Sequence, residues 1–103
     1  MSRYFIYVNP DTFNTVKELP GNIRQRVRQA IQDLADNPRP SKSKQLTVNL
    51  IDREVWRLRI DNWRIIYAIR DSEYTIGVIA VRKRPPYEYE DLQELLDLLD
   101  LDE

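Results

Sequence analysis

Apolar and polar residues alternate with a period of two over several short segments, which is the pattern of β-strands with one buried face. A first strand is expected over residues 3–8, and the segment LTVNLI, residues 46–51, is expected to start the rest of the sheet. Three more strands follow over residues 55–60, 64–70 and 74–82 as an antiparallel meander. The segment TIGVIAV is apolar on both faces, so this strand is expected to be central and covered on each side.

Two helices are expected between the first strand and the rest of the sheet. Asn9 and Pro10 are typical of a helix start, because asparagine caps free N–H groups and proline suits the first helical position. Phe13, Val16 and Leu19 are expected to form the buried side of this short helix. After a break at residues 20–22, helical spacing predicts a second helix with an apolar stripe formed by Ile23, Val27, Ala30, Ile31 and Leu34.

The remaining segments complete the element order. Residues 36–45, DNPRPSKSKQ, are expected to end the second helix and form a loop. A last helix is expected over residues 88–103, with a stripe of Leu92, Leu95, Leu96 and Leu99. The order β-α-α-β-β-β-β-α predicts an α+β fold, in which two helices pack on a small antiparallel-rich sheet and a C-terminal acidic helix follows. A single domain over residues 1–103 is expected from this length.

The segment VWRLRIDNWRIIYAI, residues 55–69, places arginines on one face of a predicted hairpin. Its residues 61–62, Asp-Asn, suit a two-residue loop because both tolerate a positive φ. Such a loop puts Arg59 directly opposite Arg64, with Arg57 two residues along on the same face. The other face then carries Trp56, Leu58, Ile60, Trp63, Ile65 and Tyr67.

This arginine pair has two interpretations. Like charges directly opposite each other destabilise a sheet by some tenths of a kcal/mol up to about 1 kcal/mol, so folding alone gives no reason for the pair. Nearby acids, or an acidic tail, could neutralise the arginines within the chain. Alternatively, the arginines form an anion site for phosphates, because a guanidinium binds phosphate bidentately and cannot lose its proton.

A second basic cluster, VRKRPPYEY, covers residues 81–89, where the last strand leaves the sheet. Tyrosine beside arginine can stack on a base or move a proton, although a tyrosine at a strand–helix junction is more often a packing residue. The residues of interest in this cluster are Arg82, Lys83, Arg84, Tyr87 and Tyr89.

The shared site depends on the register between the last two strands. Arg64 and Arg84 lie on one face only if the numbers of paired residues have an even sum. An odd-length loop produces this register, for example a loop over residues 71–73 with Arg70 opposite Tyr74. We therefore expect an even register.

Composition excludes several kinds of site. The chain contains no cysteine and no histidine, which removes disulfides, thiolate metal sites and histidine-based nucleophile pairs. The hydrophobic fraction of 42% is typical of a chain that folds. The N-terminal apolar run is too short for export or membrane insertion, so a soluble cytoplasmic protein without membrane contact is expected.

Charge is distributed unevenly along the chain. Residues 88–103 contain eight acids and no basic residue, so residues 1–87 hold all 16 Lys and Arg against 9 acids, a net charge of +7. A basic body indicates a polyanionic partner. The acidic helix is expected either to lie over or beside the arginine face, where it competes weakly with RNA phosphates, or merely to solubilise a packed helix.

The segment VWRLRIDNWRIIYAIRDSEYTIGVIAVRKR, followed by a tyrosine, resembles the RelE/ParE superfamily of bacterial type II toxins. The shared pattern is a basic x-Arg-x-Arg strand, an aromatic-Arg-hydrophobic-hydrophobic-Tyr strand, and an apolar strand that ends in a basic cluster. The segment DLADNPRP after the second helix fits this family as well. The resemblance covers roughly residues 3–90.

The resemblance implies one of two activities. RelE-like members are ribosome-dependent mRNA endonucleases, whereas ParE-like members inhibit DNA gyrase and lack the basic catalytic set. The basic residues and tyrosines favour the RelE-like branch, with Arg64, Arg84 and Tyr89 as the implied catalytic residues. The spacing after Arg84 differs from the family pattern by about one residue, so Tyr87 competes with Tyr89. A non-enzymatic ParE-like toxin, or a degenerate member that only binds its antitoxin, is the alternative.

The implied mechanism uses no metal and no cofactor. The ribose 2′-OH attacks the adjacent phosphate, and arginines stabilise the charge that develops on the phosphate oxygens. Arginine is a poor general base because it stays protonated, so a tyrosine or the ribosome supplies the base. Implied partners are a cognate antitoxin, the ribosome and mRNA, and the toxin is either a dimer or part of a toxin–antitoxin hetero-oligomer.

Several basic residues lie outside the predicted hairpin, in the expected loop and on the second helix. Lys42 and Lys44 in the expected loop either contact RNA backbone or are simply solvated. Arg24 and Arg28 on the second helix are expected to form a solvated basic face. The implied substrate-binding set is Arg57, Arg59, Arg82, Lys83, Lys42, Lys44 and Tyr87.

Overall fold

A computed structural model describes residues 3–47 and 52–83. Its elements are β1 (Phe5–Val8), α1 (Pro10–Lys17), α2 (Gly21–Asp33), β2 (Ser43–Leu46), β3 (Glu54–Ile60), β4 (Trp63–Arg70) and β5 (Thr75–Lys83), with a 3-10 turn at Asp71–Glu73. The predicted acidic helix and the candidate site residues Arg84, Tyr87 and Tyr89 lie outside the described residues.

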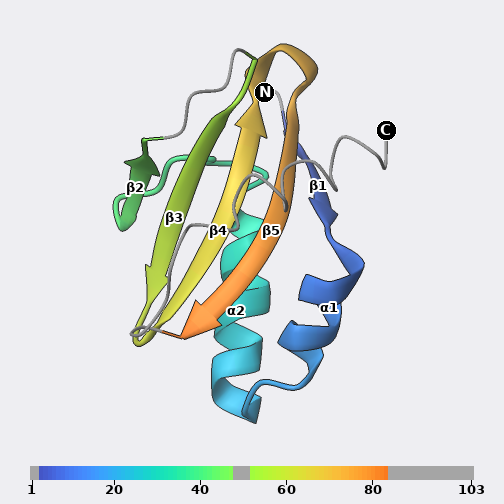
Figure 1. Cartoon of the computed structure of the whole chain (residues 1–103), viewed down its shortest axis with the longest axis vertical. Coiled ribbons are helices and arrows are strands. Elements are labelled where there is room, and N and C mark those ends of the chain that lie inside the picture. Colours follow the sequence, from blue (N-terminus) through green and yellow to red (C-terminus); the bar gives the residue numbers. More distant parts are fainter. Residues whose placement is uncertain (1–2, 48–51, 84–103) are drawn as a thin grey trace.

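The strands form one five-stranded mixed sheet in the order β1-β5-β4-β3-β2. β1 runs parallel to β5, and all other neighbouring strands are antiparallel. Both helices cover the same face of the sheet, which the ribbon in Figure 1 makes visible. This arrangement confirms the predicted α+β fold and the element order as far as β5. As predicted, β5 lies inside the sheet, between β1 and β4.

The core forms between the two helices and the sheet. From α2, the buried residues Val27, Ile31 and Leu34 confirm the predicted stripe, and Ile23 and Ala30 pack against it. The sheet contributes Leu58, Ile65, Tyr67, Ile69, Ile76, Val78 and Val81 to the same cluster. Burial raises the pKa of Tyr67 to about 12, and its hydroxyl donates a hydrogen bond of 2.7 Å to the Pro38 carbonyl. The Tyr67 ring therefore lies in the core, and its hydroxyl is hydrogen bonded to the segment that follows α2.

The first helix begins where the sequence predicts. The Asn9 side-chain oxygen accepts a hydrogen bond of 2.9 Å from the backbone N–H of Asp11, and Pro10 is the first helical residue. This side-chain cap satisfies one of the free N–H groups at the start of the helix. Val16 and Leu19 are buried as predicted.

The expected burial of Phe13 is wrong, because its side chain is 54% exposed. Its neighbour Thr12 is buried instead, and the Thr12 hydroxyl donates a hydrogen bond of 2.9 Å to the Ile79 carbonyl on β5. This contact and the packing of Val16, one turn further along, set the rotation of α1 on the sheet. A polar residue therefore takes the position that the hydrophobic pattern assigns to phenylalanine.

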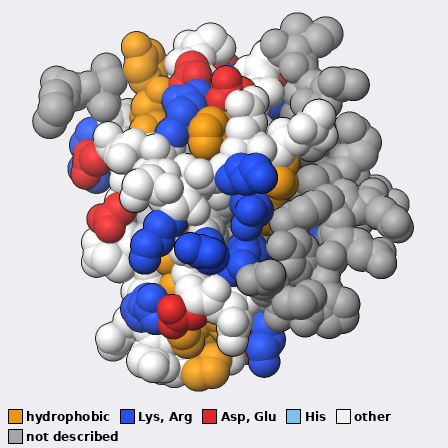
Figure 2. Space-filling view, turned by 90° about the vertical axis from the view of Figure 1, so that its left-hand side faces the viewer, with side chains coloured by type: hydrophobic (Ala, Val, Ile, Leu, Met, Phe, Trp, Pro, Cys, Tyr) orange, Lys and Arg blue, Asp and Glu red, His pale blue; other side chains and the backbone are white. Residues whose placement is uncertain are grey.

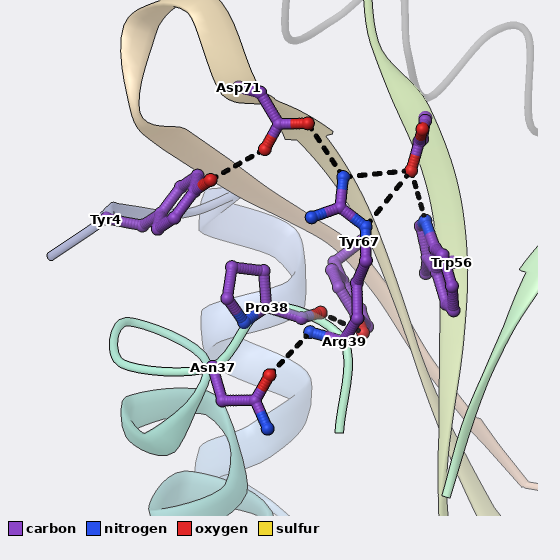
Figure 3. A network of polar contacts seen from close by, with 8 residues as sticks. Tyr4, Asn37, Pro38, Arg39, Trp56, Tyr67 and Asp71 are labelled. Atoms are coloured by element: carbon purple, nitrogen blue, oxygen red, sulfur yellow. Dashed lines mark hydrogen bonds and ion pairs between the residues drawn. The ribbon is translucent and has the colours of Figure 1, made fainter. Parts of the chain in front are cut away.

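The segment after α2 is fastened to the sheet by Arg39 (Figure 3). Its guanidinium donates to Glu54 at 3.0 and 3.2 Å and to Asp71 at 2.7 Å. Glu54 also accepts a bond of 2.8 Å from the Trp56 indole, and Asp71 accepts one of 2.6 Å from the Tyr4 hydroxyl. One arginine thereby joins the start of β3 to the turn that follows β4.

The second strand lies earlier in the chain than the sequence predicts. β2 covers Ser43–Leu46, so it begins inside the segment 36–45 expected to be a loop and shares only Leu46 with the expected strand, whose residues 48–51 lie outside the described residues. The Ser43 N–H and hydroxyl both donate to the Pro40 carbonyl, at 2.9 and 2.6 Å, so the chain turns there and enters the sheet at once. β2 is an edge strand with two exposed central residues, so no alternation of burial marks it in the sequence.

The predicted turn between β4 and β5 is also wrong in its length. Arg70 pairs with Thr75 instead of Tyr74, and Tyr74 takes a left-handed conformation with φ of 53°. The numbers of paired residues therefore have an odd sum at this end of the strands. The register changes at a β-bulge, where Ile66 pairs with Ala80 while the next residue, Tyr67, pairs with Val78. From the bulge to the end of β5 the register is even, as predicted, although the cause is the bulge and not the loop.

Candidate phosphate-binding face

A row of arginines crosses the sheet face opposite the helices. Arg59 pairs with Arg64, as predicted, and Arg64 pairs in turn with Arg82 on β5. The backbone N–H of Arg59 donates to the carbonyl of Lys42 at 3.4 Å, so a fourth basic residue continues the row. Three adjacent strands therefore each contribute an arginine at one level, and we call this set, Arg59, Arg64 and Arg82, the arginine row.

A second pair of basic residues lies two positions further along the strands. Arg57 on β3 pairs with Lys44 on β2. Lys44 is thus a strand residue, which corrects the expectation that it lies in a loop, whereas Lys42 lies in the turn before β2. Figure 2, which faces the side of the molecule where β2 lies, shows basic side chains gathered across the middle of that surface.

Arg64 is the buried member of the row, because the residue is only 2% exposed. Its Nη1 donates to two backbone carbonyls, that of Asp61 at 2.9 Å and that of Trp63 at 3.0 Å. Its Nε is buried and has no hydrogen-bond partner among residues 3–47 and 52–83. An unsatisfied buried donor is costly, and such groups in native proteins call for an explanation. The bound Nη1 leaves the edge formed by Nε and Nη2 as the guanidinium's remaining donor pair.

The described acids do not neutralise the basic face. Among residues 3–47 and 52–83, no carboxylate lies in an ion pair with Arg57, Arg59 or Arg64. The arginines that do form such pairs lie elsewhere: Arg3, Arg26, Arg39, Arg53 and Arg70. Within the part of the chain that the structure describes, the positive charge of Arg57, Arg59 and Arg64 is therefore not balanced by an ion pair, and an anionic ligand would balance it.

The turn between β3 and β4 has a side-chain partner that sequence reasoning missed. The turn residue Asp61 has φ of 51°, and its carboxylate forms a two-point ion pair with Arg26 of α2. Arg26 holds the pKa of Asp61 below its ordinary value, so the carboxylate is ionised at neutral pH. The two residues are separated by 35 positions, and neither has a local signal that marks the contact.

The remaining candidate residues divide into two groups. Lys83 pairs with Trp63 and so shares the helix-covered face, away from the arginine row.

Arg24 and Arg28, expected to be simply solvated, line a groove of about 490 Å³ beside β1. Its walls are Ile6, Val8, Phe13, Val16, Lys17, Arg24, Arg28, Ile31 and Gln32. The groove lies between β1 and the two helices and takes no part in the arginine row.

The sequence matches a known protein family. Residues 14–85 match the family described as the ParE toxin of the type II toxin–antitoxin system parDE, which is more than half of the chain. The chain belongs to the ParE toxin family. It is therefore a toxin of a type II toxin–antitoxin system in the RelE/ParE superfamily, as the sequence resemblance implies. No curated protein matches the chain.

Solved structures similar to this ParE-family toxin carry the RelE name. RelE in the archaeal RelE–RelB complex from Pyrococcus horikoshii OT3 is 18% identical, with a TM-score of 0.74 over 82% of this chain and 99% of that one. The toxin–antitoxin complex RelBE2 from Mycobacterium tuberculosis gives 23% identity and a TM-score of 0.65 over 80% and 99%. The isolated E. coli RelE toxin gives 20% identity and a TM-score of 0.60 over 93% and 98%. At these identities the likeness establishes the fold.

Within the described residues, no helix has the length and apolar character that a membrane crossing requires.

Proposed function

We propose that this toxin is a ribosome-dependent mRNA endonuclease. The observation that supports the proposal is the arginine row: three arginines at one level of the sheet, of which Arg59 and Arg64 have no carboxylate partner among the described residues. A cross-strand row of like charges is unfavourable for folding, so a binding role accounts for it better than a structural one. Phosphate is the ligand that arginine forks suit.

In this proposal, the chain cleaves RNA by transfer within the substrate. The ribose 2′-OH attacks the neighbouring phosphorus, the bond to the 5′-oxygen of the next nucleotide breaks, and a 2′,3′-cyclic phosphate and a 5′-OH remain. Arg64 donates through its Nε–Nη2 edge to the phosphate oxygens as they gain charge, and Arg84 is proposed to assist. Tyr89 or Tyr87 is the proposed proton-transfer residue.

The burial of Arg64 sets a condition on this mechanism. Because the residue is only 2% exposed, a phosphate cannot reach the guanidinium in the structure described above. In this proposal, a phosphate reaches Arg64 only after the groups that cover its guanidinium have moved. Arg59, which is exposed, and Lys42 and Lys44 at the rim are the groups that first meet the RNA backbone.

A cognate antitoxin is the proposed partner. The family match names a toxin–antitoxin system, and two of the similar structures cited above are RelB–RelE or RelBE complexes. By analogy, we propose a complex of this toxin with an antitoxin. The ribosome and its mRNA are the proposed targets of the free toxin.

The family match supports a second candidate, because it is to the ParE branch. In this alternative the toxin is not an enzyme and inhibits DNA gyrase, and the basic face binds a protein or DNA. The two candidates predict different targets. They can therefore be separated by one pair of assays on the same purified protein.

The deciding experiment incubates the toxin with ribosomes programmed with a defined mRNA, and the new 5′ ends are mapped. We expect cleavage by the wild type and none of an mRNA with 2′-deoxyribose at the cleaved position, since the 2′-OH is the nucleophile. Arg64→Lys keeps the charge but loses the Nε–Nη2 edge, and should lower the cleavage rate by about 100- to 1000-fold. Arg3→Gln, on an arginine outside the face, is the control and should cleave normally. An intact mRNA together with inhibited gyrase supercoiling would establish the second candidate.

A further inference from the structure

The β3–β4 turn connects α2 to the arginine row through Asp61. The Asp61 carboxylate binds Arg26 of α2, and the Asp61 carbonyl accepts the hydrogen bond from Nη1 of Arg64. Asp61 has a left-handed backbone, with φ of 51°. In this conformation its side chain contacts α2 while its carbonyl contacts Arg64. A single turn residue thus contacts a helix arginine and a row arginine.

The Arg26–Asp61 pair is too exposed to have stability as its main effect. The two side chains are 50% and 56% exposed, and solvated ion pairs of this kind contribute little to folding. Its geometry is nevertheless specific, since both guanidinium Nη atoms contact the two carboxylate oxygens. A two-point contact fixes orientation as well as distance. The pair therefore constrains where the tip of the hairpin lies relative to α2.

Arg64 depends on that turn for its own orientation. The two hydrogen bonds that Arg64 makes to described residues both use Nη1, and one acceptor is the turn carbonyl of Asp61. If the turn rotates, that carbonyl moves and the guanidinium loses one of the two contacts that fix its plane. The Nε–Nη2 edge would then no longer be held in one direction.

We propose that Arg26 and Asp61 are positioning residues for Arg64, which hold the turn so that the Nε–Nη2 edge of Arg64 faces the phosphate. This inference rests on the proposed function for its consequence in catalysis, but the positioning itself is a property of the free protein. Misplacement of a catalytic group by about 1 Å can lower a rate by about 100-fold. Loss of the pair should therefore lower kcat by about 10- to 100-fold and leave KM nearly unchanged.

The first test measures the arginine side chain directly, without activity. In the ¹⁵N-labelled full chain, NMR resolves guanidinium protons that rotate slowly because they are hydrogen bonded. We expect separate Arg64 Nη1 signals in the wild type, and averaged signals in Arg26→Gln and in Asp61→Asn, where asparagine preserves the left-handed turn. The Arg59 signals act as an internal control and should not change. Unchanged Arg64 signals in both variants would overturn the proposal.

The second test asks whether the two residues act through each other. In the ribosome assay, the double variant Arg26→Gln/Asp61→Asn should lose no more kcat than the worse single variant. Arg26→Lys, which keeps the charge without the two-point contact, should restore only part of the rate. Additive losses, or a loss matched by lower thermal stability, would overturn the positioning role. If the wild type does not cleave mRNA, the proposed function fails while the NMR result still decides the positioning.

Discussion

Replacing Arg39 should lower the stability of the fold at neutral pH and much less in acid. In Arg39→Met, the aliphatic stem beside Trp56 is retained, whereas the charge and the three hydrogen bonds to Glu54 and Asp71 are removed. The guanidinium also lies 5.7 Å from the centre of the Trp56 ring, so a cation–π contact is lost. These contacts join residues 39, 54 and 71, which belong to three separate segments.

The size of the effect follows from the exposure of the partners. The side chains of Arg39, Glu54 and Asp71 are 33%, 41% and 53% exposed, so water screens their attraction. Each such pair contributes from 0 to about 1 kcal/mol, and an exposed cation–π contact about 0.5 kcal/mol. The expected loss in the free energy of unfolding is about 1–2 kcal/mol. For a domain of this size, each kcal/mol lowers Tm by roughly 4–8 °C.

The pH dependence follows from the carboxylates. The pKa of Asp71 is lowered by its bonds to Arg39 and Tyr4, and that of Glu54 by its bonds to Trp56 and Arg39. A carboxyl group with a lowered pKa in the folded state stabilises the fold above its unfolded pKa, which is about 4 for these groups. That contribution is lost as the pH falls through the folded pKa. The difference between wild type and Arg39→Met should therefore be complete at pH 7 and shrink below about pH 4.

Urea unfolding followed by tryptophan fluorescence at pH 7 and at pH 3 measures this difference. Arg3→Met is the matched control, because Arg3 forms one exposed ion pair with Asp36 and should change the stability very little. An equal loss at both pH values would refute the electrostatic account and point to packing around the Arg39 stem. A loss as small as that of the control would show that the network does not stabilise the fold.

Three further predictions concern single positions. Thr12→Val should lower the free energy of unfolding by about 1–3 kcal/mol in urea melts, because it leaves the buried Ile79 carbonyl unpaired, while Thr12→Ser should retain most of the stability. Arg59→Glu should raise stability by some tenths of a kcal/mol up to about 1 kcal/mol, because it places opposite charges across from Arg64, and in the ribosome assay it should weaken cleavage. Phe13→Ser should change Tm by less than the equivalent of about 0.5 kcal/mol, because the ring is exposed, and a large drop would mean that it packs after all.

The hairpin was predictable because its signal is local. Two adjacent residues that tolerate positive φ fix the loop length, and the loop length fixes every pair from Ile60 opposite Trp63 to Arg59 opposite Arg64. The stripe on α2 was predictable for the same reason, since helical spacing depends only on neighbouring residues. The pairing of Arg59 with Arg64 was therefore predictable from a single turn.

The features that sequence reasoning missed depend on contacts between distant segments. β2 has no alternating pattern, because an edge strand of polar residues is defined by its partner β3. The burial of Thr12 depends on a carbonyl 67 residues away, and the contact between Arg26 and Asp61 on a separation of 35. The predicted three-residue turn failed because Tyr74 adopts a left-handed backbone, which is uncommon for an aromatic residue.

The β-bulge in β5 has a consequence for how the molecule opens. A bulge interrupts the strand ladder, and here the Ile79 carbonyl is bonded by a hydroxyl from α1. The helix and the middle of β5 therefore cannot separate without breaking a buried bond. We expect them to exchange their amide protons with solvent as one cooperative unit, slower than the exposed edge strand β2. Arg82 follows the bulge on the same strand, so the arginine row would then stay in register while the edge strand β2 exchanges.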